Sequence, residues 1–266
     1  MKSGPKKSLG QNFLINPGIA QKIAEACELA GEYGVIEIGP GRGALTSLLA
    51  KRAAKVLAIE LDSSLIPGLS SLCAPFDNVE ILCADALECD FKALIAERFE
   101  GRKIVIAGNL PYYITSPIIM KVLESRPGAE RAVFLVQKEA AERLCAEEGS
   151  REAGASTLAV RWYSRPRLLF DVSPGSFYPK PTVTSSLISL EIRKEPPCKA
   201  ADERKMFEII KAAFSQRRKT AANAIAAGLK TSKALVVSAM ENLGLDPGLR
   251  AERLRLCDYA ALSALL

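Results

Sequence analysis

The sequence predicts an α/β fold: a mostly parallel sheet with helices on both faces, followed by a small helical domain. Two observations predict it. Four short apolar runs alternate with helical patterns between Val35 and Ala107, which is the pattern of strand–helix–strand units in a parallel sheet. After Glu195-Pro196-Pro197 only helical patterns follow. We therefore expect two domains, residues 1–196 and residues 197–266, joined by a linker near residues 194–201.

The spacing of apolar residues predicts the elements of the first domain. A helix is expected at Ile19–Ala30, after Asn16-Pro17. The four apolar runs predict strands at Val35–Ile38, Val56–Ile59, Val79–Leu82 and Ile104–Ala107, with helices between them such as Ala44–Arg52 and Phe91–Glu100.

Later segments predict the edge of the sheet and the second domain. Ala132–Val136 predicts a fifth strand that leads into a helix at Lys138–Ala146. Leu168–Val172 and Val183–Ile192, separated by a proline-rich segment, predict an antiparallel pair that closes the sheet. The helices expected in the second domain are Asp202–Ser215, Lys219–Leu229, Ser232–Leu243 and Asp258–Leu265.

Composition excludes several kinds of chemistry. The 266 residues include no histidine, which removes the usual general base and most zinc ligand sets. The seven cysteines form no Cys-x-x-Cys pair, so we expect reduced thiols and no metal site. No apolar run approaches the ~20 residues of a membrane span, and the N-terminus lacks the apolar core of a secretory signal. We therefore expect a cytoplasmic protein without a membrane partner. We also expect it to be monomeric.

The net charge of +6 is unevenly distributed. Residues 1–22 carry +4, residues 197–266 carry +5 from 12 basic and 7 acidic side chains, and the stretch between them carries −3. A polyanion contacted by both ends would account for this distribution, because phosphate contacts dominate nucleic-acid affinity. An ordinary solvated surface accounts for it equally well.

Polar and glycine residues follow each of the first four expected strands, where an α/β sheet binds its ligands. Gly39 and Gly41 follow the first strand and let a ligand approach the backbone. Glu60 follows the second strand, 21 positions beyond Gly39, where an acid can bind ribose hydroxyls. Asp85 and Asn109 end the third and fourth strands.

The glycine loop alone does not distinguish a nicotinamide dinucleotide from S-adenosylmethionine. Gly39, Gly41 and Ala44 also satisfy the G-x-G-x-x-[GA] pattern of nicotinamide enzymes. However, the chain has neither a histidine nor a Tyr-x-x-x-Lys pair to move a proton during hydride transfer. The motif after the fourth strand also favours S-adenosylmethionine over a nicotinamide dinucleotide.

That motif, Asn109-Leu110-Pro111-Tyr112, provides what methylation of an adenine amino group needs. The N6 lone pair is delocalised into the ring, and two hydrogen-bond acceptors on the N–H groups favour a more nucleophilic, pyramidal nitrogen. The Asn109 side-chain oxygen and the Leu110 carbonyl can supply them. Pro111 stiffens the turn, and Tyr112 offers a face for stacking. A simple turn would use the same residue types, but its place after the fourth strand favours a site.

In these motifs the chain resembles the KsgA type of ribosomal RNA adenine dimethylase. The resemblance extends over nearly the whole chain, through Leu9-Gly10-Gln11-Asn12-Phe13-Leu14, Val136-Gln137-Lys138-Glu139, Pro174-Gly175-Ser176-Phe177-Tyr178-Pro179-Lys180-Pro181, Phe214-Ser215-Gln216-Arg217-Arg218-Lys219-Thr220 and Arg250-Ala251-Glu252-Arg253-Leu254. It implies a Rossmann-like methyltransferase sheet that binds S-adenosyl-L-methionine in residues 1–196 and a basic RNA-binding domain in residues 197–266.

The resemblance also implies roles for individual residues. Asn12 and Leu14 would cover the cofactor, with Gly39 and Gly41 along it, Glu60 on its ribose hydroxyls, Asp85 on its adenine, and Asn109 at its edge and at the target N6. Phe177 would face Tyr112 across the target base, although a core position for Phe177 fits the residues equally well. In the basic domain, Arg217, Arg218 and Lys219 are the candidate RNA contacts.

The family's product is N6,N6-dimethyladenosine at two adjacent adenosines near the 3′ end of small-subunit rRNA, so the implied partner is this rRNA in the immature small subunit. Two alternatives stay open: the large-subunit rRNA methylase of the antibiotic-resistance type, and a non-enzymatic ribosome assembly factor. Leu110 and Tyr113 favour the small-subunit type over the Asn-Ile-Pro-Tyr motif of the resistance type. Gly154-Ala155-Ser156 departs from the aromatic and bulkier residues expected there.

Overall fold

The computed structural model describes residue 6, residues 10–216 and residues 218–266. The chain divides into two compact units. The sheet unit holds the chain up to Ala141 together with Ser164–Ile192, and the helical unit holds Glu142–Tyr163 together with Arg193–Leu266.

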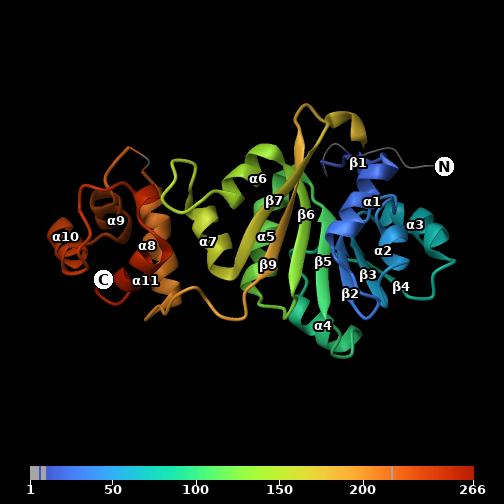
Figure 1. Cartoon of the computed structure of the whole chain (residues 1–266), viewed down its shortest axis with the longest axis horizontal. Coiled ribbons are helices and arrows are strands. Elements are labelled where there is room, and N and C mark those ends of the chain that lie inside the picture. Colours follow the sequence, from blue (N-terminus) through green and yellow to red (C-terminus); the bar gives the residue numbers. More distant parts are fainter. Residues whose placement is uncertain (1–5, 7–9, 217) are drawn as a thin grey trace. The chain divides into compact units, whose positions relative to one another are not determined.

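A seven-stranded sheet is the centre of the sheet unit (Figure 1). Its strand order is β4-β3-β2-β5-β6-β9-β7. The strands are β2 (Gly34–Ile38), β3 (Lys55–Glu60), β4 (Val79–Cys83), β5 (Ile104–Asn109), β6 (Arg131–Gln137), β7 (Ser164–Val172) and β9 (Ser185–Ile192). The first five pair in parallel, whereas β9 is antiparallel to both β6 and β7. The predicted mostly parallel sheet is confirmed, and its antiparallel strand lies one place in from the edge.

The central strands are covered on both faces. Every residue of β2 is buried, as expected for a parallel strand between two layers of helices. Because β2 pairs with β3 on one side and with β5 on the other, the strand order reverses between β2 and β5. A ligand cleft is expected at the carboxyl ends of the strands at that point.

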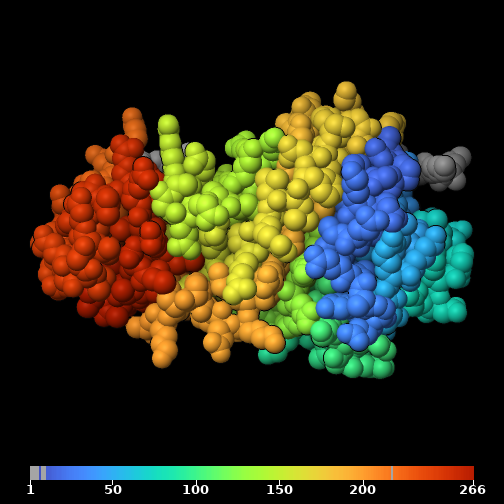
Figure 2. Space-filling view, viewed as in Figure 1, coloured from blue at the N-terminus to red at the C-terminus, as the bar shows by residue number. Residues whose placement is uncertain are grey.

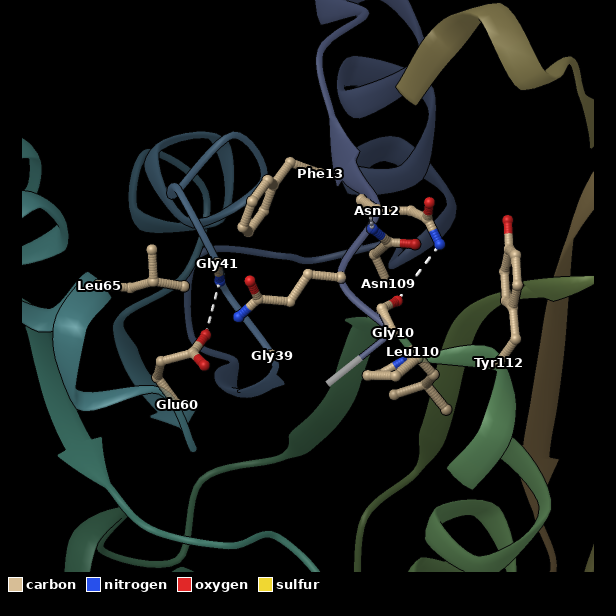
Figure 3. A pocket seen from close by; sticks show the side chains of 12 residues that line it. Gly10, Asn12, Phe13, Gly39, Gly41, Glu60, Leu65, Asn109, Leu110 and Tyr112 are labelled. Atoms are coloured by element: carbon tan, nitrogen blue, oxygen red, sulfur yellow. Dashed lines mark hydrogen bonds between the residues drawn. The ribbon is translucent and has the colours of Figure 1, made fainter. Parts of the chain in front are cut away.

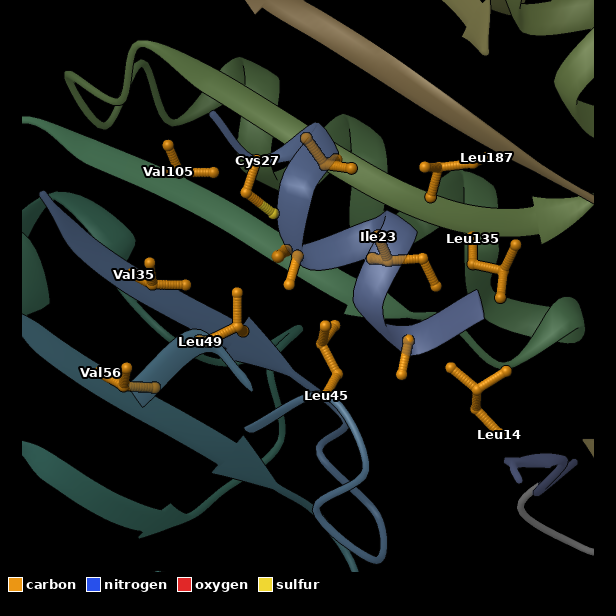
Figure 4. Close-up of a cluster of buried hydrophobic side chains, with 14 of the residues drawn as sticks. Leu14, Ile23, Cys27, Val35, Leu45, Leu49, Val56, Val105, Leu135 and Leu187 are labelled. Carbon is orange, nitrogen blue, oxygen red and sulfur yellow. The ribbon is translucent and has the colours of Figure 1, made fainter. Parts of the chain in front are cut away.

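Helix α1 (Pro17–Ala26) covers one face of the sheet. Asn16 caps it, because its side-chain oxygen accepts from the backbone N–H groups of the first turn. Ile23 of α1 packs in one core cluster with Val35, Val105 and Leu49 of α2 (Thr46–Ala50) (Figure 4). In Figure 2 the blue surface of α1 adjoins the yellow surface of β7, where the Lys22 ammonium lies 5.9 Å from the centre of the Phe170 ring.

The opposite face carries α5 (Thr115–Glu124), which lies behind the sheet in Figure 1. Because side chains alternate along a strand, Ile36 and Ile106 point away from the α1 cluster and toward this face. Ile118, Ile119 and Val122 of α5 are fully or almost fully buried. Two further α-helices of the unit are α3 (Ile66–Cys73) and α4 (Phe91–Arg98).

A separate two-stranded sheet joins the N-terminal segment to the proline-rich segment. In it, β1 (Phe13–Leu14) pairs antiparallel with β8 (Phe177–Tyr178). Phe13 lies opposite Tyr178, and Leu14 lies opposite Phe177.

Five helices make up most of the helical unit: α7 (Ala155–Tyr163), α8 (Glu203–Phe214), α9 (Ala221–Leu229), α10 (Lys233–Asn242) and α11 (Leu256–Leu262). Helix α6 (Lys138–Cys145) crosses the division between the units. None of the helices that the structure describes is long and apolar enough to cross a membrane.

The two units differ from the expected division into residues 1–196 and 197–266, because residues 142–163 cluster with the C-terminal helices. The physical reason is the contact between α7 and α8. The Tyr163 ring stacks on Phe207 with their centroids 5.8 Å apart, and the Tyr163 hydroxyl donates to Glu203. Ala155 and Ser156 begin α7, and Gly154 directly precedes it, with its N–H donating to the Thr157 hydroxyl at 2.9 Å.

Candidate active site

Two adjoining cavities lie at the carboxyl ends of the strands where the strand order reverses. The first, of about 450 Å³, is lined by residues that include Asn12, Gly41, Asn109 and Tyr112 (Figure 3). The second, of about 480 Å³, is lined by Asp85 and a set of apolar side chains. They share the lining residues Gln11, Gly39, Glu60 and Pro111, so they form one continuous cleft.

The glycine loop forms the floor of this cleft. Gly39 and Gly41 have positive φ angles of 70° and 57°, a conformation that glycine adopts without strain. A Cβ atom on Gly41 would lie 3.0 Å from the Phe13 ring, so the loop and the N-terminal segment are in close contact. The Arg42 guanidinium lies 4.6 Å from the centre of the same ring.

Just before the loop, Glu37 is buried inside β2. Burial raises the pKa of this carboxyl to about 7. The side chain does not line either cavity.

Glu60 is held at the end of β3 by backbone N–H groups. One carboxylate oxygen accepts from Gly41 N at 2.9 Å, and the other accepts from Asp62 N at 2.8 Å (Figure 3). Burial raises its pKa, and these hydrogen bonds partly oppose that shift. Since each carboxylate oxygen has two lone pairs, Glu60 can accept two further hydrogen bonds from vicinal hydroxyl groups.

Asp62 fastens the N-terminal segment beside Glu60. It accepts from Lys6 Nζ at 2.6 Å and from Gln11 Nε2 at 2.9 Å. Burial raises the pKa of Asp62, but the hydrogen bonds from Lys6, Ser64 and Gln11 outweigh it and hold the pKa below its usual value. This carboxylate is therefore charged and positions the wall of the cleft.

Asn109 ends β5 with its amide oriented by the opposite wall. Its Nδ2 donates to the Asn12 carbonyl at 2.9 Å, which directs the other amide atom, Oδ1, away from that wall. The backbone of Leu110 is anchored to β6, since its N–H donates to Leu135 O at 3.1 Å. The Thr115 hydroxyl donates to the Pro111 carbonyl at 3.1 Å and holds the turn.

The second cavity combines one carboxylate with apolar walls. Asp85 follows β4, and its Oδ1 accepts from Leu87 N at 2.9 Å. Ile59, Leu61 and Ile118 line the same cavity. A flat ring with an exocyclic amino group would match this lining.

Tyr112 is half-buried at the first cavity, and its hydroxyl lies 2.7 Å from the Ser185 hydroxyl. Phe177 and Leu14, in contrast, line neither cavity. They are paired across β1 and β8, only 2% and 7% of their surfaces are exposed, and both belong to the core cluster. The structure thus gives Phe177 the core position and leaves no ring face for a base, whereas its neighbour Tyr178 is 53% exposed.

The candidate RNA contacts lie between α8 and α9. Arg218 and Lys219 are exposed there, and Arg217 lies outside the described residues. Among the residues that the structure describes, no group of three or more His, Cys, Asp and Glu side chains is arranged to hold a metal ion.

Several residues of the site are absent from the sequence-based prediction. Gln11 and Phe13 lie within the Leu9–Leu14 segment that carries the resemblance, which is the signal that could have found them. Asp62 and Ser185 act through hydrogen bonds to residues distant in sequence, and the sequence offers no signal for either.

The sheet, with its antiparallel strand next to the edge and its cleft at the switch point, is that of the Rossmann-like methyltransferases. Two solved structures share the fold over nearly the whole chain. A dimethyladenosine transferase from Plasmodium falciparum has a TM-score of 0.79 and 27% identity, covering 94% of this chain and 95% of that one. The 23S rRNA methyltransferase ErmE has a TM-score of 0.73 and 26% identity, covering 96% and 99%.

The family model of ribosomal RNA adenine dimethylases matches residues 3–264, and the chain belongs to this family. Its relatives include the ribosomal RNA small subunit methyltransferase A of Geobacillus thermodenitrificans, which is 44% identical over 97% of this chain and 89% of its own length. The protein of the same name from Alkaliphilus metalliredigens is 42% identical over 97% of this chain and 90% of its own length.

Proposed function

We propose that the protein transfers methyl groups from S-adenosyl-L-methionine to N6 of two adjacent adenosines near the 3′ end of small-subunit rRNA, giving N6,N6-dimethyladenosine. Its whole-length similarity to proteins named small subunit methyltransferase A supports the substrate. The observation that carries the chemistry is the cleft in which Glu60 and Asp85 lie on one side and the Asn109–Tyr112 turn on the other.

The residues of the cleft fit the cofactor. Glu60 would accept hydrogen bonds from the ribose hydroxyls, and Asp85 would accept one from the adenine amino group between apolar walls. Gly39 leaves the loop backbone open to the methionine portion, since the nearest atom to a Cβ placed there would be 3.8 Å away. When bound, S-adenosyl-L-methionine supplies an electrophilic methyl group.

Asn109 and Leu110 would hold the target amine. With Asn109 Nδ2 donating to Asn12, the Oδ1 atom accepts one N6 hydrogen and the Leu110 carbonyl accepts the other. Holding N6 in line with the methyl group is a proximity effect. The methylated nitrogen is strongly acidic, so its proton can leave to water, and this chain without histidine needs no strong base.

We infer that the sheet unit binds the cofactor and the target base, while basic side chains of the helical unit, Arg218 and Lys219 among them, bind rRNA phosphates. We also propose that the physiological substrate is the immature small subunit in the cytoplasm.

The likeness to ErmE keeps a large-subunit rRNA methylase as the second candidate. The whole-length relatives at 42–44% identity favour the small-subunit enzyme.

The deciding experiment incubates the protein and radiolabelled S-adenosyl-L-methionine with immature small subunits, and separately with large-subunit rRNA. We expect N6,N6-dimethyladenosine at two adjacent positions in digests of the small-subunit rRNA only. Methylation of large-subunit rRNA alone would identify the resistance-type activity. Binding to small subunits without methyl transfer would identify an assembly factor.

A further inference from the structure

Tyr112, the residue that would stack on the target base, is in contact with a buried hydroxyl group. Its phenol oxygen lies 2.7 Å from Ser185 Oγ, and either group can donate the hydrogen bond. Ser185 is fully buried, so water does not compete for this bond. Burial raises the pKa of the Tyr112 phenol, so the hydroxyl keeps its proton at neutral pH.

Ser185 reaches this place because β9 runs antiparallel to its neighbours. The first residue of an antiparallel strand lies at the edge of the sheet where the parallel strands end. Ser185 is the first residue of β9, opposite Gln137 at the end of β6 and Val172 at the end of β7. The reversed strand therefore places a hydroxyl group at the carboxyl edge, beside the Asn109–Tyr112 turn.

The start of β9 is fixed by further bonds on both sides. The Ser186 hydroxyl donates to Asp171 at 2.7 Å, and Lys138 Nζ donates to the other oxygen of Asp171 at 2.6 Å. The Lys138 N–H donates to the Thr184 carbonyl at 3.0 Å. Ser185 is thus a rigid anchor for a ring that is itself only half-buried.

We propose that Ser185 is a positioning residue for methyl transfer: it fixes the Tyr112 ring from its hydroxyl end, so that the stacking face is set before the target base arrives. This inference rests on the proposed function, in which Tyr112 stacks on the target adenine. A ring that is already fixed does not have to be ordered when the base binds, so the entropic cost of binding the base is lower.

The test is a double-mutant cycle of Ser185→Ala and Tyr112→Phe in the full-length protein, read as kcat/KM on immature small subunits. Each single variant should lower kcat/KM by about 3- to 10-fold, the range that loss of one hydrogen bond corresponds to. The double variant should be no worse than either single one, because both remove the same bond. The affinity for S-adenosyl-L-methionine should not change.

Ser189→Ala is the matched control. Ser189 is also buried and lies on the same strand, four residues from Ser185, where it pairs with Val133 inside β6 instead of with Gln137 at the end of β6. This variant should keep wild-type kcat/KM. Wild-type kcat/KM in Ser185→Ala, additive losses in the cycle, or an equal loss in Ser189→Ala would each overturn the inference.

A second readout does not depend on methyl transfer. The probe is small-subunit rRNA with 2-aminopurine at the target position. The wild type should quench the 2-aminopurine fluorescence on binding, and Ser185→Ala and Tyr112→Phe should quench it less. Equal quenching in all three would overturn the positioning role. If the wild type quenches the probe but transfers no methyl group to unmodified small-subunit rRNA, which keeps adenosine at the target position, the proposed function fails while the positioning of Tyr112 stands.

Discussion

The sheet unit and the helical unit use charged and polar side chains in opposite ways. In the sheet unit, Glu60 and Asp62 are buried, and Asn109 has its amide fixed by a backbone carbonyl. In the helical unit, Arg218 and Lys219 are exposed, while buried residues such as Ile209 form the interior. Methyl transfer requires atoms at fixed positions, whereas attraction to phosphates requires only charge in the right region. Substitutions in the two units should therefore fail in different ways.

The largest effect is expected at Asn109. Asn109→Ala removes one acceptor from the target amine and should lower turnover by at least ~100-fold, as loss of one transition-state contact typically does. The loss should be the same at low and high salt, because no charge changes. Single-turnover methylation at two salt concentrations measures it. Asn242→Ala is the matched control, because Asn242 is an exposed asparagine of α10. Unchanged turnover in a folded Asn109→Ala protein would remove Asn109 from the mechanism.

The next effect separates cofactor binding from RNA binding. Glu60→Ala should weaken S-adenosyl-L-methionine binding by about 10-fold or more, since hydrogen bonds to charged groups are the stronger kind. RNA affinity should stay close to wild type, because the carboxylate faces the cleft. Calorimetry with each ligand tests this. Glu80→Ala provides the comparison, as Glu80 on β4 pairs with Lys55 and Arg98 and lines neither cavity. Equal cofactor affinity in wild type and Glu60→Ala would refute the assignment.

A third prediction concerns the helical unit. Replacing Arg217, Arg218 and Lys219 together with Gln should weaken RNA binding and flatten its dependence on salt, by roughly 0.7–0.9 in the log–log slope per lost phosphate contact. Tyr112→Ala should lower turnover but keep the slope, because stacking of a base contributes ~1–3 kcal/mol and carries little charge. RNA affinity at several salt concentrations measures both. A wild-type slope in the triple variant would mean that these side chains form an ordinary solvated surface.

The smallest effect concerns stability and the buried Glu37. Its pKa is raised from the ordinary 4.5 to about 7, so the folded state holds a proton that the unfolded state releases between those values. The resulting stabilisation is present below pH 4.5 and is lost as the pH rises through 7. Glu37→Gln should lack this loss and gain stability relative to wild type at pH 8. Denaturant unfolding of both proteins at pH 5 and pH 8 tests it, and a constant difference between them would contradict it.

The sequence predicts the parallel strands well and some helices poorly, for a physical reason. Strands such as β2 are buried on both faces and are continuous apolar runs. Helix α3, which the sequence analysis does not predict, contains Gly68 and two serines, which disfavour helix, while Pro67 lies in the first turn, where proline is tolerated. It forms because Leu69 and Cys73 are buried, a tertiary effect that local propensity does not contain.

The parts of the site that sequence reasoning leaves open or misses depend on pairing between distant segments. Strands β1 and β8 have two residues each, too few for an alternating pattern. Whether Phe177 or Tyr178 faces the core is set by register with β1, and a shift of one residue would exchange them. Ser185 is likewise invisible from Tyr112, because 73 positions separate the two hydroxyl groups in sequence.

The pairing of β1 with β8 has a consequence for protein synthesis. Asn12, whose carbonyl orients Asn109, directly precedes β1, and β1 has its partner strand only at Phe177–Tyr178. A nascent chain that has emerged as far as β6 already contains the glycine loop, Glu60 and Asn109, but β1 still lacks its partner strand. Ser185 follows later still, on β9. The pocket is therefore completed by late, long-range contacts, and a translating ribosome carries an unfinished enzyme until about two thirds of its 266 residues have emerged.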